Sequence, residues 1–191
     1  MVKYQSTRGH KETISFEDVI LSGLAPDKGL YLPDSLTIDN LNHLTEEDLS
    51  YEDFVKTIFI ALDKNSAKYV DDLSLYSGFE NSAEPVLKDL NDTTLIMELF
   101  HGPTKSFKDY ALQPLGAIAD KRLSELGERG LVLVATSGDT GSAAIQAVKE
   151  SENIDIVVLH PADKISDYQR QQMTSVIKDN VLNIAVNGSY D

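Results

Sequence analysis

The sequence predicts an α/β protein in which a mixed N-terminal region precedes a small parallel-sheet βαβ unit. From about residue 93, continuous apolar runs alternate with helical segments, as in parallel strands joined by crossover helices. Hydrophobic residues make up 41% and charged residues 25% of the 191 positions, which suits a globular protein with a sizeable core. We therefore expect two regions, residues 1–90 and 91–191.

The first region opens with short, irregular elements. Residues 2–4 can form a strand, and Ser15–Asp18 has the pattern of a capping box that begins a helix. Gly23 is expected to end that helix. Pro26–Gly29 predicts a turn, which an apolar strand at 30–32 follows.

Two more helices complete this region. Thr45–Asp48 predicts a capped helix start, and the apolar residues from Tyr51 to Leu62 then recur with helical period. A third helix is expected at 66–76. Nothing in these patterns indicates chemistry, so we expect the region to act as scaffold.

The second region is regular. Ser106–Asp109 and Ser166–Gln169 fit capping boxes at two of its helix starts. Because the strands are apolar throughout, we expect one parallel sheet that is covered on both faces. The expected strands are 94–100, 131–135, 154–159 and 181–186. The expected helices are 107–126, 141–151 and 166–178.

Lys108 is the most informative residue, because it lies where a predicted strand gives way to a helix. The positive end of a helix dipole disfavours an ammonium group, and a free amine is what a Schiff base with an aldehyde requires. Gly102 and Pro103 shape the approach to the helix, and Phe107 is an apolar neighbour. The alternative is an ordinary solvated lysine.

A loop of small and polar residues, Thr136–Ser142, follows the next strand. Its glycines at 138 and 141 allow close backbone approach, and a helix start offers N–H groups to a carboxylate or phosphate. An ordinary tight turn is an equally good interpretation. The loop lacks the Gly-Lys-Ser/Thr of a Walker motif and the full G-x-G-x-x-G of a dinucleotide fold. Loops after parallel strands share one crevice, so we expect Lys108 and this loop to meet.

Composition disfavours several other functions. The sequence has no cysteine, and its four histidines show no helical ligand spacing, so we expect no metal site. A net charge of −14 argues against a nucleic-acid or anionic-membrane surface. The N-terminal residues lack the apolar segment of a signal peptide, and no apolar run approaches a membrane span. We expect a cytoplasmic protein.

Two segments resemble a known family. Phe100–Gln113 is similar to the segment that carries the pyridoxal 5′-phosphate (PLP) lysine in threonine synthases. Ala135–Ala144 is similar to the loop that cradles the substrate carboxylate across the wider tryptophan-synthase-β-like PLP enzymes. Tyr4–Gly9 with Gly23–Pro33, and Gln169–Met173, resemble the same family. The resemblance covers the whole chain as an N-terminal portion, with 91–191 as the first part of the PLP-dependent domain.

The resemblance implies an enzyme that converts O-phosphohomoserine and water to threonine and phosphate with PLP as cofactor. It implies that Lys108 is catalytic and holds PLP, and that Asp139 also contacts the cofactor. Many relatives have Asn where this chain has Asp139, and the Asp form resembles the threonine-synthase branch. The residues implied to bind the substrate carboxylate are Ser137, Gly138, Asp139, Thr140 and Gly141.

In this family the PLP-phosphate loop and the residue facing the pyridine nitrogen come later than Asp191. We therefore expect a truncated chain that is catalytically silent and self-associates over an exposed apolar surface. Two alternatives stay open. One is a related PLP-dependent phospho-lyase, and the other is a non-catalytic anion-binding α/β module.

Overall fold

The computed structural model describes residues 2–35, 49–80 and 82–188. The chain forms two compact units, Met1–Ser74 and Leu75–Asp191, each described here by itself. The family domain boundary near residue 90 stays a prediction. In the described ranges, no helix combines the length and the apolar character that crossing a membrane requires.

The N-terminal unit begins with a two-stranded sheet. Strands β1 (Tyr4–Ser6) and β2 (Tyr31–Pro33) pair antiparallel, close to the expected positions. Helix α1 (Phe16–Val19) has the predicted cap, because the Ser15 hydroxyl accepts a hydrogen bond from the Asp18 N–H. The helix ends at Val19, several residues before the expected stop at Gly23.

Among the described residues of this unit, the helical segments that follow are α2 (Tyr51–Leu62), the 3-10 helix η2 (Lys64–Ser66) and α3 (Ala67–Val70). Ser50 caps α2, and the predicted start at Thr45–Asp48 lies outside the described residues. The expected helix at 66–76 is therefore shorter than predicted.

Aromatic rings form the core of this unit. The ring of Phe16 lies between those of Tyr4 and Tyr69, with centroid distances of 6.2 and 5.9 Å. Burial, with Asp63 and Glu17 nearby, raises the pKa of Tyr4 to about 12. The phenol therefore stays neutral at physiological pH. The expectation that this region acts as scaffold stays a prediction.

The second unit begins with a β-hairpin that the sequence did not predict. Strand β3 (Val86–Asn91) pairs antiparallel with β4 (Thr94–Glu98), and Asn91 accepts a hydrogen bond from the Thr93 N–H in the turn. The expectation that 94–100 joins the parallel sheet is wrong. A neighbouring strand across a short turn is a far more local partner than a strand reached through a helical crossover.

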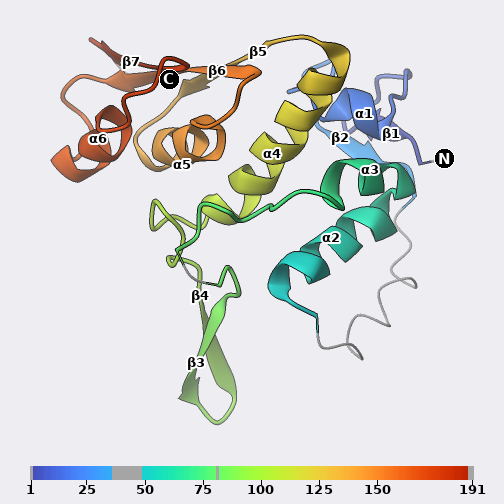
Figure 1. Ribbon diagram of the computed structural model, residues 1–191, viewed down its shortest axis with the longest axis horizontal. Coiled ribbons are helices and arrows are strands. Elements are labelled where there is room, and N and C mark those ends of the chain that lie inside the picture. Colours follow the sequence, from blue (N-terminus) through green and yellow to red (C-terminus); the bar gives the residue numbers. More distant parts are fainter. Residues whose placement is uncertain (1, 36–48, 81, 189–191) are drawn as a thin grey trace. The chain divides into compact units, whose positions relative to one another are not determined.

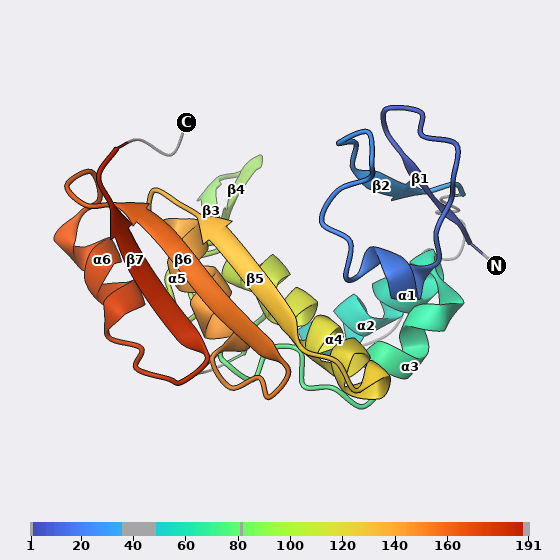
Figure 2. The ribbon, with the colours of Figure 1, turned by 90° about the horizontal axis from the view of Figure 1, so that it is seen from above.

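The other three predicted strands do form one parallel sheet. Its order is β5-β6-β7, and all pairs are parallel. The helices labelled α4, α5 and α6 lie together on one face of this sheet (Figures 1 and 2). The strands are β5 (Gly130–Ala135), β6 (Ile154–Pro161) and β7 (Val181–Val186), and the helices are α4 (Asp109–Leu126), α5 (Asp139–Val148) and α6 (Asp167–Thr174).

Only one face of the sheet is covered within the described residues. Ile156 and Val158 pack with Ile145 and Met173 in the core beneath the helices. On the other face, Leu131, Leu133 and Leu182 are exposed by 66, 65 and 53%. The expected cover on both faces is therefore wrong for this chain, and an apolar sheet face is left open, as the family resemblance led us to expect.

Candidate active site

Lys108 occupies the N-cap position of α4, as predicted for a lysine at a helix start. Its ammonium nitrogen lies 4.7 Å from the centre of the Phe107 ring, so the expected apolar neighbour is in contact. The side chain is 28% exposed, which leaves the amine within reach of a small molecule.

The loop before Lys108 is fixed by a buried carboxylate. Asp109 is fully buried and accepts hydrogen bonds from the Thr104 N–H at 2.9 Å and the Thr104 hydroxyl at 2.8 Å. The predicted capping box Ser106–Asp109 forms only in part: the Asp109 carboxylate also accepts from the Ser106 backbone N–H, but the Ser106 hydroxyl accepts from the Lys108 N–H at 3.4 Å and not from that of Asp109. A Cβ at Gly102 would lie 2.5 Å from the Asp109 carboxylate, so glycine is needed for this close approach.

Burial raises the pKa of Asp109, although the two hydrogen bonds from Thr104 and the charge of Lys105 act in the opposite direction. Lys105 adopts a left-handed backbone with φ of 62°, which is uncommon outside glycine. The segment that delivers Lys108 to the helix start is thus held in a defined, partly strained shape.

Thr136 shapes the second predicted loop. Its hydroxyl accepts hydrogen bonds from the N–H groups of Gly138 at 2.9 Å and Gly141 at 3.2 Å. Gly138 is the N-cap of α5 with φ of 144°, a conformation that favours glycine. The N–H groups of Asp139 and Thr140, in the first turn of α5, donate to no acceptor within the described ranges. They form the open, positive end of the helix.

The two loops meet. The Lys108 ammonium lies 3.9 Å from a carboxylate oxygen of Asp139, which confirms the expectation that Lys108 and the 136–142 loop come together. Gly141 is placed differently, because it is buried and its Cα faces Met173 and Thr136. Its role visible here is packing, and its N–H is already engaged.

Sequence reasoning gave no role to several residues that build the site. Thr104 and Thr136 organise the two loops, but a threonine in a loop motif carries no signal of its partner. Gln169 and Gln172 of α6 donate hydrogen bonds to Asp139 at 2.6 Å and to the Thr104 carbonyl at 2.9 Å. The sequence assigned Gln169 to a helix cap and Gln169–Met173 to the family resemblance, but neither pattern connected these residues to the site.

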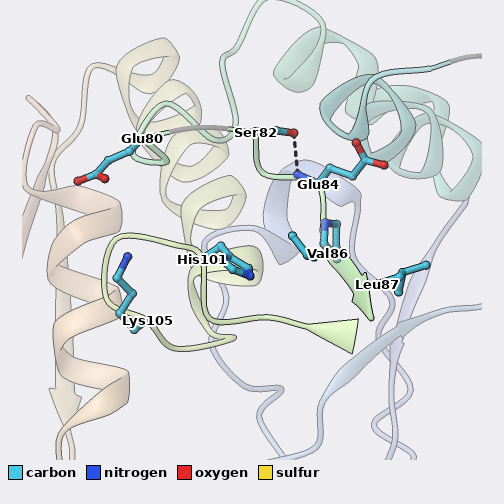
Figure 3. A pocket seen from close by; sticks show the side chains of 8 residues that line it. Glu80, Ser82, Glu84, Val86, Leu87, His101 and Lys105 are labelled. Atoms are coloured by element: carbon cyan, nitrogen blue, oxygen red, sulfur yellow. Dashed lines mark hydrogen bonds between the residues drawn. The ribbon is translucent and has the colours of Figure 1, made fainter. Parts of the chain in front are cut away.

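A cavity of about 610 Å³ borders the segment that leads to Lys108 (Figure 3). Of its lining residues, His101 pairs with Glu98 at 2.9 Å, and Lys105 brings a lysine to the cavity. Glu80 and Glu84 also line the cavity, and no cluster suited to a metal ion occurs among the residues that the structure describes. The cavity is lined by Glu80, Ser82, Glu84, Pro85, Val86, Leu87, His101 and Lys105.

Comparison of the sequence with known proteins points in one direction. Residues 3–70 match the family model described as "Threonine synthase N terminus". The whole chain is 41% identical to threonine synthase from Pseudomonas aeruginosa, and 98% of it aligns with threonine synthase from Saccharomyces cerevisiae at 36% identity. The chain spans 42% and 40% of the length of these two relatives.

Comparison of the fold with solved structures gives the same result as comparison of the sequence. The whole chain superimposes on the PLP-bound threonine synthase from Brucella melitensis with a TM-score of 0.87 and 35% identity, covering 42% of that structure. Yeast threonine synthase gives a TM-score of 0.81 at 33% identity over 99% of the chain and 41% of that structure. Both the N-terminal unit and the two loops of the candidate site lie within the matched length.

Proposed function

Because the chain corresponds along its whole length to the N-terminal part of threonine synthases, we propose that the full-length protein makes threonine and phosphate from O-phosphohomoserine and water. The similarity to relatives that bear this name supports the proposal. The observation that carries it is the placement of Lys108, whose amine lies 3.9 Å from the carboxylate of Asp139 in the first turn of α5.

The residues present fit the aldehyde part of PLP. Lys108 offers a primary amine that is partly exposed and lies against the apolar ring of Phe107. In this proposal Lys108 would hold the cofactor through that nitrogen, and Asp139 would border it. When bound, PLP would accept electron density from the reacting carbons of the substrate. The family resemblance places the groups for its phosphate beyond Asp191.

The chain's own groups account for binding and proton transfer. The free N–H groups of Asp139 and Thr140 would hold the substrate carboxylate, with Ser137, Gly138 and Gly141 forming the surrounding loop. Once released from the cofactor, the Lys108 nitrogen would take and return protons at the substrate's α and β carbons. Asp109 keeps the preceding loop in place through Thr104, so that the nitrogen is already oriented.

The test uses the full-length protein. Threonine and phosphate should appear in equal amounts from O-phosphohomoserine when PLP is supplied. Borohydride reduction followed by peptide mapping should find the cofactor on Lys108. Lys108→Ala should abolish both results, whereas Lys164→Ala, at an exposed lysine remote in sequence, should preserve them. Phosphate release without threonine would favour a related phospho-lyase, and phosphate binding without PLP linkage would favour the anion-binding module.

The open sheet face supports a further part of this proposal. Leu131, Leu133 and Leu182 form an exposed apolar surface, so the 191-residue chain should self-associate despite its net charge of −14. The cytoplasmic location expected from the sequence also stays a prediction, which fractionation of cells that express the full-length protein would test.

A further inference from the structure

Gln169 joins two hydrogen bonds that together fix its side-chain amide. Its Oε1 accepts from the Ser166 hydroxyl at 3.1 Å, and its Nε2 donates to Asp139 at 2.6 Å. The Gln169 N–H also donates to Ser166, which caps α6 as predicted. The amide is therefore oriented from both ends, and one oxygen of Asp139 is committed to α6.

Helix α6 is itself anchored to both site loops. Gln172 donates to the Thr104 carbonyl, in the loop before Lys108. Met173 is fully buried under Gly141, where a Cβ would lie 2.6 Å from its sulfur. Gly138 packs equally closely, because a Cβ there would lie 2.5 Å from the Gln169 side chain. Gln169 thus has little freedom to follow Asp139 if the carboxylate moves.

The distance between Lys108 and Asp139 is longer than that of a tight ion pair. A tight ion pair between an ammonium and a carboxylate has an N–O distance of about 2.7–2.9 Å. Here the separation is 3.9 Å, while the bond from Gln169 to the same carboxylate is 2.6 Å. The glutamine amide holds Asp139 more closely than the lysine does.

We propose that Gln169 is a positioning residue that restrains Asp139 from closing on Lys108, which keeps the lysine nitrogen available for the cofactor aldehyde. The inference rests on the proposed function for its purpose, but its physical content concerns only these three side chains. A tight ion pair would engage the nitrogen whose lone pair must attack the aldehyde carbon.

Reductive methylation of the full-length protein tests this restraint without PLP. The Lys108 nitrogen bonds to the carbon of formaldehyde, water leaves, and cyanoborohydride reduces the carbon–nitrogen double bond. Peptide mapping gives the rate at Lys108. Gln169→Leu should slow it by about two- to fivefold, the effect of one partly exposed ion pair. Gln171→Leu, at an exposed glutamine of the same helix, should leave the rate unchanged.

The same substitution in an Asp139→Asn background separates positioning from general damage. There Gln169→Leu should have no effect on the rate, because no carboxylate remains to close on Lys108. Gln169→Glu keeps the cap and the contact with Ser166 but cannot donate to Asp139, so it serves if the leucine variant does not fold. An unchanged rate, or equal slowing in both backgrounds, overturns the inference. Failure of PLP to link to Lys108 in the unaltered protein instead overturns the proposed function.

Discussion

Substitution of Asp109 should reveal how firmly the loop before Lys108 is held. Asp109→Ala leaves the N–H and hydroxyl of the buried Thr104 without acceptors, and each unpaired group costs about 1–3 kcal/mol. Removing a buried charge offsets part of this cost, so we expect a net loss of about 2–4 kcal/mol in the free energy of unfolding. Asp109→Asn can accept from the N–H and donate to the hydroxyl oxygen, and should cost less than about 1 kcal/mol.

The free energy of unfolding of the same variants should also depend on pH, which provides a second test of the role of Asp109. Burial holds the pKa of Asp109 above its usual value, so the folded state binds this proton more tightly than the unfolded chain does. The resulting stabilisation is complete below the unfolded pKa of about 3.9 and is lost as pH rises through the folded pKa. Asn does not titrate. The difference in the free energy of unfolding between the unaltered protein and Asp109→Asn therefore reports the titration of Asp109 alone.

Urea denaturation of the full-length protein at several pH values provides the measurement. Between the two pKa values, the free-energy difference should move in favour of Asp109 by about 1.4 kcal/mol for each unit that the pH falls. If Asp109→Ala and Asp109→Asn lower the free energy of unfolding equally, the hydrogen bonds from Thr104 to residue 109 do not stabilise the fold. If the difference is flat or moves the other way, the carboxylate is not desolvated in the folded protein.

Three further outcomes are expected. Leu131→Glu with Leu133→Glu should shift the 191-residue chain toward monomer in sedimentation velocity, and an unchanged distribution would show that association uses another surface. Gly141→Ala should destabilise by about 1–3 kcal/mol, since its Cβ would lie 2.6 Å from Met173 and Thr136. Gly23→Ala, in open space, is its control in thermal denaturation. The 191-residue chain alone should release no phosphate from O-phosphohomoserine, and turnover at an ordinary enzyme rate would show that its site is complete.

Local signals in the sequence predicted much of the fold. The caps at Ser15 and Ser166 formed as expected, because each depends on residues only three positions apart. The apolar runs at 131–135, 154–159 and 181–186 became parallel strands for a similar reason, since a helix connects each of them to the next and makes the connection a crossover. The prediction for the run at 94–100 was wrong. Its hairpin partner at 86–91 contains charged residues and was not predicted as a strand.

The candidate site also has one part that local sequence signals predict and one part that they do not. Lys108 and the 136–142 loop could be found because their residue types are unusual for where they stand along the chain. The restraint from Gln169 could not, because it spans 30 positions and uses a residue that is ordinary on a helix surface. Its meaning depends on the orientation of one amide and on two distances, 2.6 and 3.9 Å, that exist only once α5 and α6 have packed. The position of Lys108 at a helix start can therefore be predicted from the sequence, whereas the proposed restraint on Asp139 depends on how the helices pack.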